Sequence, residues 1–85
     1  MKMKEILQFT ANWCQPCKML SPRMEKLKSE GKINYRKIDV DQDQDLSIKY
    51  GVRNIPTLIL LENGEAKNRL TGVQSEQQII DFYNG

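Results

Sequence analysis

The residues best suited to chemistry in this 85-residue chain are its two cysteines, the only two that the sequence contains. Cys14 and Cys17 are separated by two residues, so their thiols can meet across one turn of backbone. Thiol–disulfide exchange needs a thiolate that attacks and a second thiol that resolves the mixed disulfide. A secreted disulfide scaffold of this size usually carries several more cysteines. The pair is therefore expected to open and close as a redox-active disulfide.

The cysteines are expected to lie at the start of a helix, because apolar residues recur at three- and four-residue spacing over residues 14–29. Pro16 is tolerated in the first helical turn, whereas Pro22 is expected to kink the helix. The unpaired N–H groups and the dipole of a helix N-terminus favour negative charge. Cys14 is thus predicted to be the nucleophilic thiolate, and Cys17, one turn deeper, the shielded resolving thiol.

The remaining sequence predicts the elements that hold this helix. Asn63 and Gly64 form a strong hairpin signal between two strands, and the pattern from Ser75 to Gln78 is a capping box. A short helix with acidic residues at its start is expected to end near Tyr50. The expected strands cover residues 4–10, 33–40, 57–61 and 65–70. The result is a single α/β domain over residues 1–85, in the order β-α-β-α-β-β-α.

Charge, hydropathy and motif spacing argue against several classes of function. The net charge of +2 is small and interspersed, which argues against nucleic acid. The longest apolar run, residues 58–61, is too short to span a membrane. Residues 1–7 resemble no secretion signal, so a cytoplasmic location is expected. Counted from Asp39, an EF-hand would need Gly and Glu where Gln44 and Tyr50 stand, so a calcium loop is rejected.

The residues around the cysteines resemble a known family. Residues 13–18 read Trp-Cys-Gln-Pro-Cys-Lys, which resembles the Trp-Cys-Gly-Pro-Cys-Lys motif of the thioredoxin family. The similarity covers nearly the whole chain in order, through Pro22, Asp39-Val40-Asp41, Tyr50-Gly51-Val52-Arg53, Ile55-Pro56-Thr57, Asn63-Gly64 and Gly72.

This resemblance implies a thioredoxin fold with a four-stranded mixed sheet flanked by helices. It implies that Pro56 is a cis proline beside the cysteines, and that substrate peptides dock on a surface of Trp13, Ile55, Pro56, Gly72 and Val73. Trp13 is expected to shield the cysteines and contact substrate, although it could simply cover the edge of the core.

The chain departs from the family pattern in several places. It begins at what would be the second strand, a truncation that brings its length close to that of glutaredoxins. Residues 33–40 should then form an edge strand, where Arg36 and Lys37 oppose edge-to-edge pairing. Gln15 replaces the usual Gly, and Asn54 stands where a small Gly is common.

The departure with the largest consequence is Gln8, which stands where the family has a buried aspartate. That aspartate is thought to take a proton from the resolving cysteine, and an amide cannot act as a base. Lys37 matches the lysine that accompanies the aspartate. Asp39 is the nearest replacement by sequence, but strand alternation could point it away.

The expected activity is reduction of protein disulfides by a monomer with no cofactor beyond the cysteine pair. A thioredoxin-reductase-like protein or glutathione would supply electrons, and a glutaredoxin-like use of glutathione remains an alternative. A second alternative is a non-redox subunit of a larger assembly. The third is a metal site, but one cysteine pair supplies too few ligands, so zinc or an iron–sulfur cluster would require a dimer.

Overall fold

The computed structural model describes residues 3–85; Met1 and Lys2, the start of the segment expected to lack a secretion signal, lie outside them. The order of elements is the predicted β-α-β-α-β-β-α. The strands are β1 (Lys4–Thr10), β2 (Tyr35–Asp39), β3 (Thr57–Glu62) and β4 (Glu65–Thr71). The helices are α1 (Gln15–Ser29), α2 (Gln44–Lys49) and α3 (Glu76–Asn84).

The four strands form one mixed sheet in the order β2-β1-β3-β4. β1 runs parallel to β2 and antiparallel to β3, and β4 pairs antiparallel with β3. The expected edge position of β2 is confirmed. Because β1 lies inside the sheet, the loop that leaves its end carries the cysteines to the end of the sheet's central strands.

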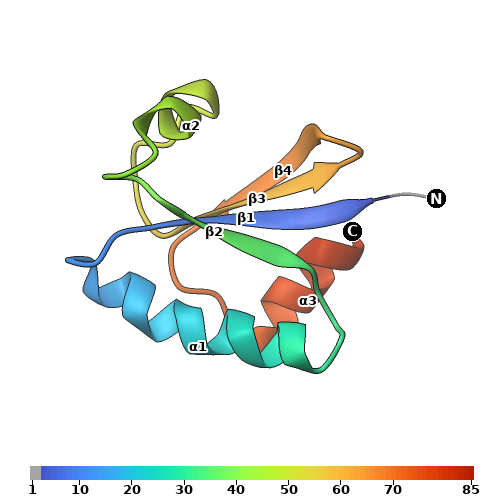
Figure 1. Cartoon of the computed structure of the whole chain (residues 1–85). Coiled ribbons are helices and arrows are strands. Elements are labelled where there is room, and N and C mark those ends of the chain that lie inside the picture. Colours follow the sequence, from blue (N-terminus) through green and yellow to red (C-terminus); the bar gives the residue numbers. More distant parts are fainter. Residues whose placement is uncertain (1–2) are drawn as a thin grey trace.

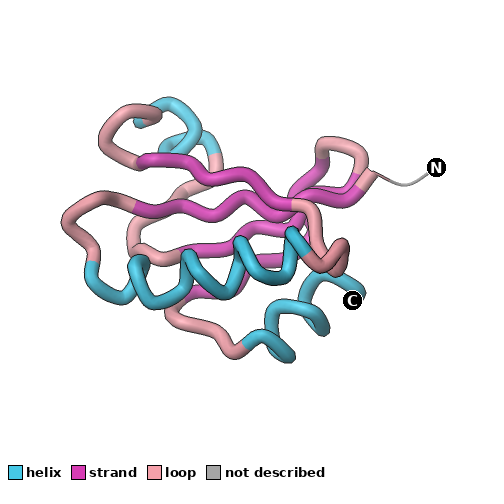
Figure 2. Tube along the Cα trace, turned by 60° about the horizontal axis from the view of Figure 1, so that its bottom comes forward, coloured by secondary structure: helices cyan, strands magenta, loops and turns pink. Residues whose placement is uncertain are grey.

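Helices cover both faces of the sheet, with α1 and α3 on one and α2 on the other (Figure 1). Figure 2 shows α1 and α3 side by side across their face. Strand alternation sends Ile6 of β1 into the cluster with α1 and α3, and sends Leu7 and Phe9 into the cluster on the α2 side. No helix among residues 3–85 is long and apolar enough to cross a membrane.

Local sequence signals set most element boundaries. Asn63 and Gly64 both have positive φ, 52° and 84°, as a two-residue hairpin turn requires. The capping box of α3 is present: Ser75 Oγ accepts from the Gln78 N–H, and the Gln78 side chain accepts from the Ser75 N–H. α2 begins only at Gln44, because the Asp43 side chain caps it.

Two elements, β2 and α1, differ in detail from the predicted pattern or extend past a proline. β2 begins at Tyr35 and is shorter than predicted. The predicted strand includes Ile33 because it is apolar, and it is indeed buried in the core, but it lies in the loop before the strand. α1 continues through Pro22 to Ser29, so this proline does not end the helix. The kink expected there stays a prediction.

Candidate active site

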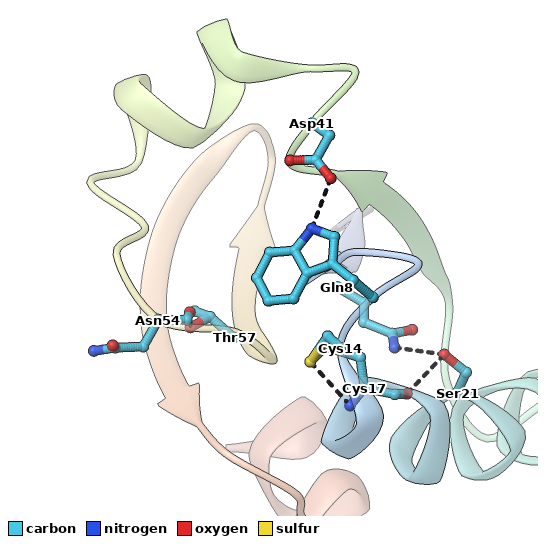
Figure 3. Close-up of a disulfide and its surroundings, with 8 residues drawn as sticks. Gln8, Cys14, Cys17, Ser21, Asp41, Asn54 and Thr57 are labelled. Atoms are coloured by element: carbon cyan, nitrogen blue, oxygen red, sulfur yellow. Dashed lines mark hydrogen bonds between the residues drawn. A yellow bond between two sulfur atoms is a disulfide. The ribbon is translucent and has the colours of Figure 1, made fainter.

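Cys14 is the N-cap residue of α1, with the extended backbone of a cap (φ −91°, ψ 107°). Its Sγ accepts a hydrogen bond of 3.3 Å from the backbone N–H of Cys17 (Figure 3). The two cysteines form a disulfide, and their Cα atoms are 5.3 Å apart. Cys14 therefore lies at the N-terminus of a helix, as predicted.

Both sulfur-bearing residues are nearly inaccessible in this disulfide form. Cys14 is 4% exposed and Cys17 is 1% exposed, so the expected contrast in accessibility is small here. The physical reason is that Ala11 is buried with the pair and the half-buried Val40 and Ile55 pack against it. The prediction that Cys14 is the accessible thiol concerns the reduced protein and stays a prediction.

Trp13 lies beside this pair and is 67% exposed. Its indole N–H donates a 2.8 Å hydrogen bond to Oδ2 of Asp41, in the loop between β2 and α2 (Figure 3). This bond fixes the ring while leaving most of it open to a substrate. From the sequence, Asp41 is recognised only as an acidic residue before α2 and as part of the family-like Asp39-Val40-Asp41 segment, and this contact was missed because the two residues are 28 positions apart.

The Ile55–Pro56 peptide bond is cis, as the family resemblance implied. Pro56 itself is less than 2% exposed, which corrects the expectation that it forms part of the open substrate surface. It is buried because it leads directly into β3, the strand with the most continuous burial. Its carbonyl accepts a 2.8 Å hydrogen bond from the Gly72 N–H, which brings the loop after β4 to the site.

Of the other residues expected on this surface, Trp13 is exposed, whereas Ile55, Gly72 and Val73 are half-buried. Within residues 3–85, nothing hydrogen-bonds to the backbone N–H or C=O of Ile55. Asn54, the departure beside the cis proline, is exposed and its side chain points away from the cysteines (Figure 3). The backbone of Ile55 is therefore left available for pairing with an extended peptide.

Gln8 is fully buried behind the cysteines, as the alignment of β1 predicted. Its Nε2 donates to Ser21 Oγ at 3.1 Å, and Ser21 Oγ donates to the Cys17 carbonyl at 3.1 Å (Figure 3). Gln8 Oε1 has no protein partner among the described residues. Sequence reasoning missed Ser21. Its position four residues after Cys17 was the available signal, because a helical serine often bonds to the carbonyl at i−4.

Lys37 and Asp39, the ionisable residues considered for this site, lie on the same face of β2, and each bonds to a group other than Gln8. Lys37 is the register partner of Gln8 across β1 and β2, but its side chain is exposed and lies 3.3 Å from Glu25. Asp39 accepts a 2.9 Å bond from the Asp41 N–H. Both residues line a pocket of about 400 Å³ that also includes Ser21. The structure thus gives Lys37 an ion-pair partner on α1 in place of the buried one.

The other predicted site residues lie where the motif places them. Gln15 and Pro16 form the exposed first turn of α1, between the two cysteines. In the part of the chain that the structure describes, no cluster of three or more His, Cys, Asp or Glu residues could hold a metal ion. The site offers a disulfide, an exposed aromatic ring and an open backbone edge, which together suit exchange with a polypeptide disulfide.

Comparison with known proteins gives consistent matches. The model of the family described as Thioredoxin matches residues 1–84. A thioredoxin of Rickettsia felis is 37% identical over 81 residues, covering 93% of this chain and 77% of that protein. A mitochondrial thioredoxin of Mus musculus is 39% identical over 79 residues. This match covers 91% of this chain but only 48% of the mouse protein. A solved mutant thioredoxin from Halobacterium salinarum is 40% identical with a TM-score of 0.89, covering 95% of this chain and 72% of the other.

Proposed function

The chain belongs to the thioredoxin family and is a thiol–disulfide oxidoreductase that reduces protein disulfides, and we propose that Cys14 is its nucleophile and Cys17 its resolving cysteine. The observation that carries this assignment is the hydrogen bond from the Cys17 N–H to Cys14 Sγ at the start of α1. When the disulfide opens, the same N–H and the helix dipole stabilise a thiolate on Cys14. No hydrogen bond among residues 3–85 reaches Cys17 Sγ.

The proposed reaction has two exchange steps. The Cys14 thiolate attacks one sulfur of the substrate disulfide, forming a mixed disulfide and releasing the other substrate sulfur as a thiolate. Cys17, as its thiolate, then attacks Cys14 Sγ and displaces the second substrate sulfur. The substrate gains two electrons and takes up two protons, and Cys14 and Cys17 become the disulfide seen in the structure.

The substrate is proposed to bind as an extended peptide antiparallel to Ile55. Its backbone pairs with the N–H and C=O of Ile55, which have no hydrogen-bond partner within residues 3–85, in the manner of an added strand. Trp13 and Val73 supply apolar contacts on either side. The buried Pro56 contributes by setting the course of the chain rather than by direct contact.

A thioredoxin-reductase-like protein is proposed as the electron donor, in preference to glutathione, because the Trp-Cys-x-Pro-Cys motif is that of thioredoxins. The protein is further proposed to act as a monomer in the cytoplasm, where a reducing poise keeps a disulfide reductase supplied with electrons. Assays with NADPH and a thioredoxin reductase, compared with assays with glutathione, test the donor. Faster turnover with glutathione would favour the glutaredoxin-like alternative.

The cysteine roles are tested by trapping. Cys17→Ser mixed with a peptide disulfide should accumulate a mixed disulfide through Cys14, which mass spectrometry of the tryptic digest identifies. Cys14→Ser is the matched control and should trap little. In the reduced parent, limited alkylation should label Cys14 first. Preferential labelling of Cys17, or trapping through Cys17, would reverse the assignment.

A further inference from the structure

An arginine of α1 reaches the loop that forms one wall of the proposed substrate surface. Arg23 lies on the cysteine-bearing helix and is half-buried. Its Nη1 donates a 2.7 Å hydrogen bond to the carbonyl of Gln74, which is 51 positions away in the sequence. The short distance is typical of a charge-assisted bond.

Gln74 in turn holds the residues just before it. Its side-chain Nε2 donates to the carbonyls of Thr71, at 3.1 Å, and Gly72, at 3.4 Å. Gly72 has a φ of +97°, which other residues adopt only with strain, and its N–H bonds to the Pro56 carbonyl at 2.8 Å. The segment 71–74 is thus tied to α1 at one end and to the cis-proline segment at the other.

We propose that Arg23 and Gln74 are positioning residues that fix the wall formed by Gly72 and Val73, and so determine how tightly polypeptide disulfides bind. This proposal rests on the proposed function. Arg23 connects the wall to the helix that carries Cys14 and Cys17, so the spacing between wall and sulfur is set before substrate arrives. A loop that must be ordered during binding lowers affinity, whereas a pre-ordered loop does not. We assign neither Arg23 nor Gln74 a role in the thiol chemistry.

A nearby pair of residues supplies a matched control. Lys26, one turn further along α1, forms an ion pair with Glu76 at 3.0 Å. The hydrogen bond and the negative charge of Glu76 raise the pKa of Lys26. This pair joins α1 to α3, and in the described part of the chain neither side chain hydrogen-bonds to segment 71–74. Removing it tests whether a general loosening of α1 against α3 has the same effect.

The experiment compares a protein disulfide with a small-molecule disulfide as substrate. Arg23→Met should raise KM for the protein disulfide by about five- to tenfold, the equivalent of one such hydrogen bond, with kcat nearly unchanged. Turnover of the small disulfide should not change, because it does not need the wall. Arg23→Lys should restore part of the affinity, and Lys26→Met should behave like the parent.

A second readout does not depend on activity. Amide hydrogen exchange at Gly72 should speed up in Arg23→Met and stay unchanged in Lys26→Met. Gln74→Leu carries the same tests if Arg23→Met does not fold. An unchanged KM together with unchanged Gly72 exchange, or equal losses with both substrates, would overturn the proposal. A parent protein inactive on both disulfides would instead refute the proposed function, while the exchange result would still report on the loop.

Discussion

At the scale of single residues, Gln8 decides how this site differs chemically from the family pattern. The amide is fully buried, and its one protein partner among the described residues is the Ser21 hydroxyl. A neutral group is less costly to bury here than a carboxylate. Gln8→Asp is therefore expected to lower the free energy of unfolding by about 1–3 kcal/mol at neutral pH. The same change should speed release of the mixed disulfide, because a positioned base typically contributes roughly 10²–10⁴-fold.

The pH dependence of this variant follows from the same reasoning. Burial disfavours the charged form, so the new carboxyl should have a raised pKa in the folded protein. The stability loss should then be small below about pH 4, the ordinary pKa range of Asp, and grow as pH rises. Denaturant melts across pH and stopped-flow exchange measure both effects, with Ser21→Ala as the uncharged control. A variant as stable as the parent and no faster would show that Gln8 has no such role.

At the scale of elements, each helix start is stabilised by a side chain from its own sequence neighbourhood. The α3 capping box is the most complete, with Ser75 and Gln78 bonded reciprocally at 3.1 and 2.8 Å. Ser75→Ala should lower the free energy of unfolding by about 1 kcal/mol and Tm by roughly 4–8 °C. Thermal and denaturant melts measure the loss. Ser29→Ala, at the exposed end of α1, is the control and should change stability much less. An equal loss in both variants would contradict this interpretation of the cap.

At the scale of the whole molecule, the two faces of the sheet are unequally supported. The cluster shared with α1 and α3 contains ten buried residues, whereas the cluster on the α2 side contains five. α2 contributes no fully buried residue, and its Ile48 is 78% exposed. Segments with few buried contacts open at lower free energy than core strands.

Native-state hydrogen exchange should therefore show slower-exchanging and faster-exchanging parts of the molecule. Amides of β1 and β3 should be the slowest, and those of α2 should exchange faster by about tenfold or more. The β1–β3 pairing is interior to the sheet, so its amides open only with the whole core. The amides of α3 serve as the comparison, because this helix buries Ile79 and Phe82. Equal protection in α2 and β1 would show that the two faces unfold as one unit.

The sequence by itself determined what depends on near neighbours in the chain. It predicted the element order, the cysteine at a helix start, the hairpin at Asn63 and Gly64, and the box at Ser75. Each of these depends on backbone propensities and on hydrogen bonds that span only a few residues. Family resemblance added the cis bond before Pro56, which no local signal distinguishes from an ordinary trans proline.

Only the tertiary structure decided which distant side chains meet. The bonds between Trp13 and Asp41, Gln8 and Ser21, and Arg23 and Gln74 join residues 28, 13 and 51 positions apart. The ion pair of Lys37 with Glu25 and the burial of Pro56 were likewise decided by packing. Long side chains such as Lys and Arg have many rotamers of similar energy, so their partners depend on where the sheet and helices come to lie.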